Sequence, residues 1–234
     1  MINEMIRAAA LAQARAEYPS EACGLVIERP GGLDYIPCRN VSSSIRGQFV
    51  MAAEDYARAE DSGKVVAVVH SHCDLPPRPS QADLKGCEES GLPWYIVSVP
   101  SGAWESLRPS GYRAPLVGRD FAHGIFDCYS LIRDWYAQER GITLPDFPRV
   151  DEWWKAGQNL YMDNFRVAGF SRVDTLEIGD VIIMQIGSRV PNHAGVYIGP
   201  NLMLHHLRKK LSAREVYGGY WQKNTRMIVR HGVQ

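Results

Sequence analysis

The sequence of 234 residues predicts a two-domain protein, with an α/β first half and an α+β second half. In the first half, segments with a helical spacing of apolar residues alternate with short β-branched runs. In the second half, helical patterns come first, and strand patterns follow from Gly179 onward. Residues 100–118 are rich in Pro, Gly and Ser, so we place the boundary near residue 115 and assign residues 1–112 and 116–234 to the two domains.

The first half is expected to contain three helices and four strands. The expected helices cover residues 1–18, 51–61 and 80–87. The expected strands cover residues 25–27, 35–38, 64–69 and 94–99. Residues 64–69 form an uninterrupted run of mainly β-branched side chains, which is typical of a buried central strand. The turn signal at residues 29–32 favours a hairpin between the first two strands.

The second half is expected to begin with a helix at Cys128. Apolar residues follow Cys128 at positions i+3, i+4, i+7 and i+8, which is one face of a helix that Gly141 ends. A second helix is expected over residues 151–167, which include Trp153 and Trp154. The expected strands cover residues 180–186, 193–199, 201–207 and 225–231.

Composition excludes several classes of function. Lys and Arg together number 26, as do Asp and Glu, so the zero net charge gives no support to a nucleic-acid partner. No apolar run approaches the roughly 20 residues that cross a bilayer, so no membrane insertion is expected. Charged residues interrupt residues 1–18, which are therefore not typical of a secretory signal. Five cysteines, an odd number, favour free thiols in a reducing compartment.

A first group of residues indicates a metal site. His70 and His72 lie two residues apart at the end of the expected central strand, so their side chains share a face. With Asp83 they offer two imidazoles and a carboxylate, which can hold zinc and leave one coordination position open. Glu21 is the candidate proton shuttle, and Ser80 can donate a hydrogen bond to an oxyanion.

The segment from Ser80 to Asp83 also has an alternative, purely structural interpretation. It is shaped like a helix capping box, with Asp in the place of Glu. Taken alone, that interpretation is the better one, and each histidine alone is a weak signal. The combination of the four positions with an upstream acid is what favours metal chemistry.

A second group of residues indicates nucleophilic catalysis. Cys128 lies at the start of a helix, whose exposed N–H groups and dipole are expected to stabilise a thiolate. His193 starts a strand downstream, and His205 follows 12 residues later on a strand that can lie beside it. His206 is the alternative to His205, because adjacent strand residues face opposite ways and only one can face the site.

Both groups resemble known families. The upstream Glu with H-S-H and S-x-x-D, together with the segment YPSEACGL at residues 18–25, resembles the JAMM (MPN-type) zinc metallopeptidases over about residues 1–110. The resemblance implies a mixed sheet with flanking helices and one zinc ion. It also implies a role for each matched residue: His70, His72 and Asp83 as ligands, Glu21 as general base and Ser80 as oxyanion donor.

Asp127-Cys128, then HAGVYIG, then a histidine 12 residues after the first one, resembles the NlpC-type cell-wall peptidases over about residues 116–234. That resemblance implies a papain-like domain with helices packed on an antiparallel sheet. It implies Cys128 as nucleophile, His193 as base and His205 as the orienting third member.

The order of the two domains resembles tail-tip proteins of lambda-like tailed phages. The resemblance implies a hydrolase that cuts peptidoglycan stem peptides and a second peptide or isopeptide bond, in tail-tip assembly, in cell-wall penetration during DNA entry, or in both. It implies peptidoglycan peptides and other tail-tip proteins as partners, with synthesis in the host cytoplasm and carriage on the virion tail tip. The alternatives are a non-enzymatic assembly factor with vestigial sites, or a chain with one active domain and one scaffold domain.

Overall fold

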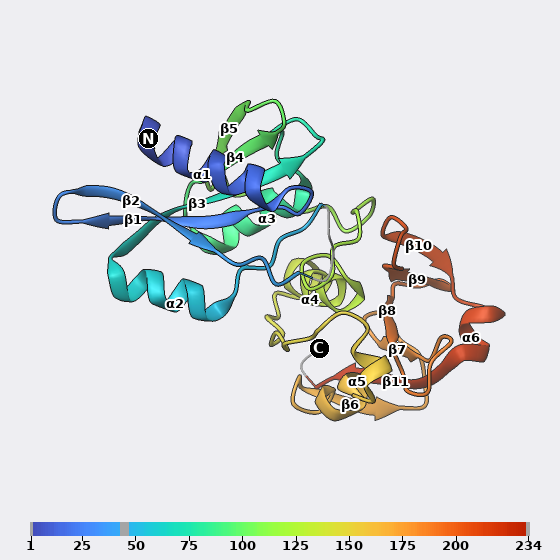
Figure 1. Cartoon of the computed structure of the whole chain (residues 1–234). Helices are drawn as coiled ribbons and strands as arrows, with labels where there is room; N and C mark the ends of the chain where they lie inside the picture. Colours follow the sequence, from blue (N-terminus) through green and yellow to red (C-terminus); the bar gives the residue numbers. More distant parts are fainter. Residues whose placement is uncertain (1, 43–46, 233–234) are drawn as a thin grey trace. The chain divides into compact units, whose positions relative to one another are not determined.

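The computed structural model describes residues 2–42 and 47–232, and it divides the chain into two compact units, Met1–Arg113 and Ala114–Gln234 (Figure 1). Each unit has its own sheet and its own apolar core. The first unit alternates helices with strands, whereas the second has its main helix first and its strands after it. The expectation of an α/β half followed by an α+β half is therefore confirmed.

The first unit is built on a five-stranded mixed sheet with the order β2-β1-β3-β4-β5. Only the pairing of β3 with β4 is parallel among these neighbours. The strands are β1 (Cys23–Arg29), β2 (Gly32–Cys38), β3 (Lys64–Cys73), β4 (Trp94–Val99) and β5 (Trp104–Leu107). The expected hairpin and the expected central strand are confirmed, and β3 runs past residue 69, so that it includes both histidines.

Helices cover both faces of this sheet (Figure 1). The helices are α1 (Glu4–Glu17), α2 (Ala53–Ser62) and α3 (Gln81–Ser90). Ile6 and Ala10 of α1 pack with Val69 on one face, while Ala59 of α2 and Cys87 of α3 pack in the core on the other. The alternation of side chains along β3 accounts for this arrangement, because successive residues point to opposite faces.

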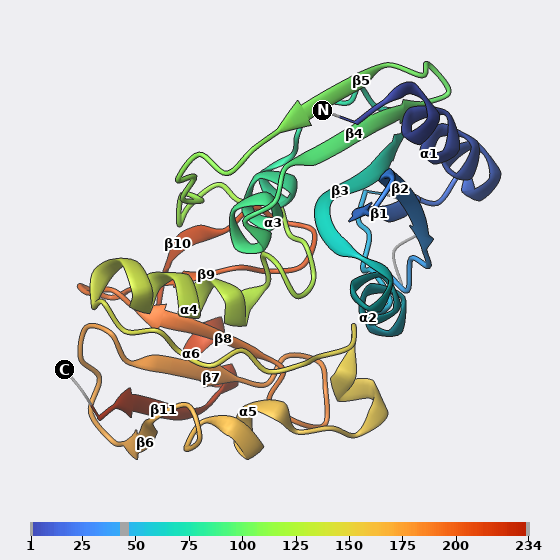
Figure 2. The ribbon, with the colours of Figure 1, turned by 90° about the vertical axis from the view of Figure 1, so that its left-hand side faces the viewer.

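The second unit is a six-stranded antiparallel sheet with the order β10-β9-β8-β7-β11-β6. Its strands are β6 (Phe170–Val173), β7 (Val181–Met184), β8 (His193–Tyr197), β9 (Leu202–His205), β10 (Ala213–Val216) and β11 (Thr225–His231). Helix α4 (Cys128–Glu139) lies against β8 and β9 (Figure 2). It packs on the sheet through Leu131, Trp135 and other apolar residues. The short helix α6 (Tyr220–Asn224) brings Trp221 into the core on the opposite face of the sheet.

The expected helix over residues 151–167 is wrong. The chain forms a 3-10 helix, η1 (Trp153–Ala156), and a separate short helix, α5 (Leu160–Asn164). Gly157 lies between them with φ of 80°, a left-handed conformation that ends a helix and that glycine adopts without strain. Burial of Trp153, rather than helical periodicity, determines the path of this segment.

Gly24 of β1 lies close against Tyr35 and Ile36 of β2. A Cβ atom at this position would lie 2.7 Å from the backbone oxygen of Ile36 and would overlap the ring of Tyr35. The Tyr35 hydroxyl donates to Oε1 of Gln13 at 2.5 Å, so the ring is not free to move aside. Residue 24 is therefore a glycine because there is no room for a Cβ atom, and not because of its φ angle.

We expect Gly24→Ala to destabilise the first unit by about 1–3 kcal/mol, the range for overpacking a well-packed site. Urea denaturation followed by fluorescence measures the change. The control is Gly218→Ala in the second unit, where the added Cβ would meet nothing nearer than a Val216 methyl group at 3.9 Å. An equal effect of the two substitutions would contradict the explanation.

Candidate active sites

In the first unit, β3 and α3 bring a carboxylate to two imidazoles. His70 and His72 project from one face of β3, and Asp83 comes from the first turn of α3. The His70 Nε2 atom lies 3.0 Å from Asp83 Oδ1, and the His72 Nε2 atom lies 3.2 Å from Asp83 Oδ2. The two Nε2 atoms are 3.3 Å apart. All three side chains are buried.

Asp83 serves the helix and the site at the same time. The backbone N–H of Ser80 donates to Asp83 Oδ2 at 2.7 Å, and the backbone N–H of Asp83 donates to Ser80 Oγ at 3.1 Å. This reciprocal pair is a capping box. The structural and the metal-binding interpretations of this segment are therefore compatible, because the cap fixes the carboxylate in front of both imidazoles.

The three side chains fit a zinc ion. The His72 Nδ1–H faces the Pro76 carbonyl oxygen at 3.0 Å, which leaves the Nε2 lone pair for a metal. Ligands about 2.0–2.1 Å from a tetrahedral zinc ion lie about 3.3 Å apart, close to the spacings found here. Among the described residues, these three form a group whose possible ligand atoms all lie within 4.8 Å of one another.

The electrostatics of this site favour an ionised Asp83. Burial raises the pKa of Asp83, but hydrogen bonds and charge from His70 and His72 outweigh burial and hold this pKa well below its usual range. Burial lowers the pKa of His72, yet the hydrogen bond with Asp83 and that with the Pro76 carbonyl raise it above its ordinary value. The ligand set therefore already holds a carboxylate that is ionised at neutral pH.

Glu21 lies just before β1 and is buried, with 4% of its surface exposed. Burial raises its pKa, and the neighbouring His70 and His72 oppose that effect. Its position is fixed by the chain around it, since the Asn40 side chain donates to the Glu21 carbonyl at 2.8 Å. Glu21 thus belongs to the same electrostatic group as the three candidate ligands, whereas Ser80 lies at its exposed edge.

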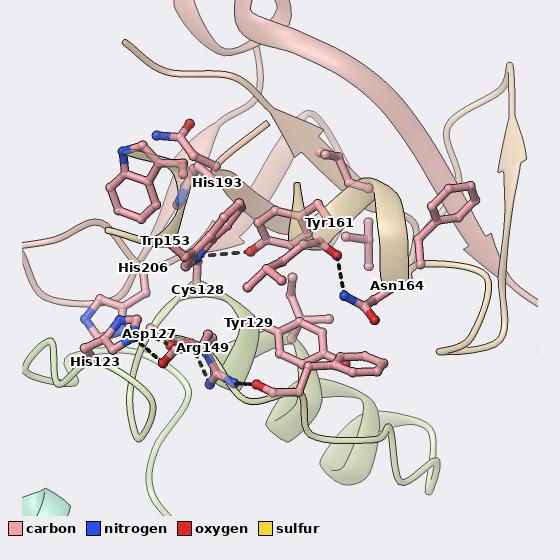
Figure 3. A pocket seen from close by; sticks show the side chains of 18 of the residues that line it. His123, Asp127, Cys128, Tyr129, Arg149, Trp153, Tyr161, Asn164, His193 and His206 are labelled. Carbon is pink, nitrogen blue, oxygen red and sulfur yellow. Dashed lines mark hydrogen bonds and ion pairs between the residues drawn. The ribbon is translucent and has the colours of Figure 1, made fainter. Parts of the chain in front are cut away.

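In the second unit, Cys128 opens α4 and lines a pocket (Figure 3). Asp127 caps the helix by accepting from the Ser130 backbone N–H at 2.8 Å. The pocket lining is mainly apolar, with both aromatic and aliphatic side chains, and His193 lies in its wall together with Cys128. Trp153 and Tyr161, from the segment that was expected to be one helix, also line it.

The strand pairing of the second unit brings two imidazoles together. His193 starts β8 and His205 ends β9, and the His193 Nε2 atom lies 3.0 Å from His205 Nδ1. His206 also lines the pocket of Cys128, with its Nε2 atom 3.1 Å from the Lys210 carbonyl oxygen and its ring against Phe121. Of the two candidates, His205 is therefore the one that contacts His193.

Cys128 is held as a thiol. Its Sγ atom lies 3.1 Å from the Tyr161 hydroxyl, and burial raises its pKa to about 11 although the Ala194 backbone N–H opposes this. Burial lowers the pKa of His193 to about 3, with the neighbouring His205 and His206 acting in the same direction. The resting pair is a thiol and a neutral imidazole. The expected thiolate at the helix N terminus is not favoured in this structure, because desolvation raises the pKa of Cys128 by more than the backbone N–H of Ala194 lowers it.

An ion pair that the sequence did not suggest fixes the base of the pocket. Arg149 donates to Asp127 Oδ2 at 2.6 Å and to Ser130 Oγ at 2.7 Å, so it ties an irregular segment to the first turn of α4. Burial opposes ionisation of Asp127, but Arg149 and two backbone N–H groups hold its pKa below its usual value. Arg149 lies in the stretch LPDFPRVD at residues 144–151, which carries no motif that could have pointed to this contact.

Comparisons with known proteins assign a family model to each unit. Residues 4–109 match the model of prokaryotic homologs of the JAB domain, and residues 118–230 match the model of the NlpC/P60 family. The chain is thus of the class that joins a JAB-like domain to an NlpC/P60 domain.

Over 227 residues it is 44% identical to tail tip assembly protein K of Escherichia phage N15, covering 95% of this chain and 93% of that protein. It is 43% identical to tail tip assembly protein K of Escherichia phage lambda over 77% of this chain and 89% of that protein. The chain therefore belongs to the family of tail tip assembly protein K.

Among solved structures, the chain is similar to a JAB1/MPN domain protein from Archaeoglobus fulgidus. The two are 23% identical, the match covers 47% of this chain and 90% of that one, and the TM-score is 0.33.

A thiol with a pKa near 11 has a characteristic pH dependence. We expect the rate at which iodoacetamide alkylates Cys128 to rise about tenfold per pH unit above neutrality, because only the thiolate reacts. Mass spectrometry of the alkylated peptide follows the reaction, and Cys128→Ala reports the labelling of the other four cysteines, which are buried. A rate that is already constant below about pH 8 would instead indicate a thiolate–imidazolium pair.

Proposed function

We propose that this chain is a two-site hydrolase of the phage tail tip. The second unit is a cysteine endopeptidase that cuts peptidoglycan stem peptides, and the first unit hydrolyses a peptide or isopeptide bond with the help of zinc. The observation that carries the proposal is the 3.0 Å contact between His205 and His193, the imidazole that lines the pocket of Cys128, since a nucleophile, a base and an orienting group are the parts that such catalysis needs.

In the second unit, Cys128 attacks the carbonyl carbon of the scissile bond as His193 takes the thiol proton. Because His193 Nε2 is engaged by His205, Nδ1 is the atom that receives this proton. The same imidazolium then gives the proton to the leaving amine, and water hydrolyses the acyl-enzyme with His193 again as base. General-base removal of the proton suits a resting site that holds a neutral thiol and a neutral imidazole.

In the first unit, His70, His72 and Asp83 would hold zinc. The metal would supply a Lewis acid that polarises a peptide carbonyl and acidifies the attacking water. Glu21 would accept a proton from that water and deliver it to the leaving amine, a role that suits a buried carboxyl group with a raised pKa. The Ser80 hydroxyl, at the exposed edge of the site, would hydrogen-bond the developing oxyanion.

Both relatives are named for tail tip assembly, so the activity belongs to building the tip, to passage of the cell wall during DNA entry, or to both. The chain would be made in the host cytoplasm and would meet other tail proteins and peptidoglycan peptides. Within the described ranges, the structure contains no helix of the length and apolar character that a membrane span requires.

One observation favours a second candidate, a non-enzymatic assembly factor. The Tyr161 hydroxyl lies against Cys128 Sγ, and the thiol has a raised pKa, as expected of a site that is closed at rest. In that case the two units would act as docking modules. Catalytic turnover by the isolated chain separates the two candidates.

If His70, His72 and Asp83 hold the metal, the purified protein should contain about one equivalent of zinc, and His72→Ala should lose it. Metal analysis by inductively coupled plasma mass spectrometry gives the content. Cys73→Ser, one residue further along β3, is the matched control and should keep its zinc, because the Cys73 sulfur faces the Ser20 carbonyl at 3.3 Å. Stoichiometric zinc in His72→Ala would refute the assignment.

If the second unit is the wall peptidase, the wild-type chain should release muropeptides from Gram-negative sacculi and Cys128→Ala should not. Liquid chromatography with mass spectrometry identifies the bond that is cut. Loss of the nucleophile should lower the rate by a factor on the order of 1000 or more. Equal release by both proteins would contradict the assignment, and release by neither would favour the assembly factor.

A further inference from the structure

Glu215 lies within reach of the histidine pair. Strand β10 pairs antiparallel with β9, with Ala213 opposite His205 and Glu215 opposite Met203. Residues 213 and 215 point to the same face of the sheet, so Glu215 is the diagonal neighbour of His205, a spacing that long side chains can bridge. Its Oε1 atom lies 3.6 Å from His205 Nε2, the ring nitrogen that His193 does not use.

The Glu215 carboxylate is held in place from its other side. The indole N–H of Trp221 donates to Glu215 Oε2 at 3.2 Å. The Trp221 ring also packs edge-on against His205, with 4.6 Å between ring centroids. One residue therefore orients both the carboxylate and the imidazole, and the two carboxylate oxygens face two N–H positions.

We propose that Glu215 is a positioning residue that sets the tautomer of the His193–His205 pair and thereby keeps His193 able to accept the proton of Cys128. This inference rests on the proposed cysteine peptidase activity of the second unit. It extends the Cys128, His193 and His205 set by a fourth member, with Trp221 as the group that orients the fourth.

The hydrogen positions on the His205 and His193 rings depend on each other. A carboxylate accepts only, so His205 carries its hydrogen on Nε2 and keeps a lone pair on Nδ1. Since His205 Nδ1 then accepts, His193 must donate from Nε2, and its own lone pair is on Nδ1. That lone pair is what takes the thiol proton. With the opposite tautomer of His205, each hydrogen would move to the other nitrogen, and His193 Nδ1 could not act as a base.

The groups around the histidine pair favour neutral rings, the state in which each ring has a single N–H. Burial lowers the pKa of His205, Glu215 opposes that effect, and Lys210 adds to it, with a pKa below the ordinary value as the result. Burial lowers the pKa of His193, and the neighbouring His205 and His206 lower it further. Neutral imidazoles have two tautomers of similar energy, so a fixed acceptor decides between them.

Glu215→Gln is the sharpest probe because the two side chains have the same shape. The two partners of residue 215, the Trp221 indole and His205 Nε2, each present an N–H, and glutamine has only one oxygen to accept from them. With its oxygen on Trp221, the amide NH₂ faces His205 Nε2 and favours the wrong tautomer. Trp221→Phe removes the competing donor but keeps an aromatic ring, so the double variant Glu215→Gln with Trp221→Phe should recover part of the native tautomer.

The test combines a spectroscopic and a kinetic measurement. Long-range ¹H–¹⁵N spectra of histidine-labelled protein report the tautomer of each ring, with His205→Asn used to assign the His205 signals. Glu139→Gln, at an exposed position near the far end of α4, is the matched control. Initial rates of muropeptide release from sacculi are measured for the same proteins, and thermal unfolding verifies that each is folded.

We expect His205 to carry its hydrogen on Nε2 in the wild type and on Nδ1 in Glu215→Gln. The rate of release should fall about tenfold or more, since a wrong tautomer disables the base. The double variant should regain part of the Nε2–H tautomer of His205 and part of the rate of release. Glu139→Gln should match the wild type in both. An unchanged His205 tautomer in Glu215→Gln, or a changed tautomer with an undiminished rate, overturns the inference.

Failure of the proposed function gives a different result. A wild-type protein that releases nothing refutes the peptidase, while the spectra still decide whether Glu215 sets the tautomer. A variant that merely loosens the sheet would lower the melting temperature without moving the hydrogen of His205. A structural role and a positioning role are therefore distinguishable in folded protein.

Discussion

Backbone pairing of the central strands is the interaction on which both sites depend. In the first unit, β3 is hydrogen-bonded between β1 and β4, which buries it and leaves its side chains no choice of face. In the second unit, β8 lies between β7 and β9 in the same way. Because side chains alternate along a strand, a slip of one residue in either pairing would turn the histidines to the opposite face and dismantle the site.

The two sites use burial for different ends. In the first, burial is opposed by opposite charge: Asp83 stays ionised because His70 and His72 compensate it. In the second site, burial favours the neutral forms of both groups, so Cys128 stays a thiol and His193 stays a neutral imidazole. The first arrangement suits the capture of a cation. The second suits proton transfer that begins only when a substrate carbonyl is present to accept the sulfur.

Much of the fold could be predicted from the sequence, where a local pattern decides the outcome. The run at residues 64–69 and the apolar spacing after Cys128 are strong predictors of β3 and α4, because burial alone imposes these patterns. The segment at residues 151–167 is different: its aromatic residues are spaced for a helix, but a glycine with positive φ and the burial of Trp153 override that spacing. Strand β10 has four residues, too few for a periodic signal.

The candidate site residues were found in the sequence as motifs, and their partners were not. His193 and His205 stand at a fixed separation, whereas Arg149, Tyr161 and Glu215 reach the pocket or the histidine pair only after the chain has folded. Contacts of this kind depend on tertiary geometry and leave no spacing to detect. Glu215 in particular is one acid among many until β10 is placed beside β9.

The contact between Tyr161 and Cys128 has a consequence for how long the thiol can survive. Oxidants attack the thiolate, so a sulfur that stays protonated and is covered by a phenol hydroxyl resists conversion to sulfenic and higher acids. Most nucleophilic cysteines gain reactivity from a low pKa and lose durability for the same reason. A cysteine guarded in this manner is expected to stay reduced for longer in the presence of an oxidant than a cysteine with a low pKa.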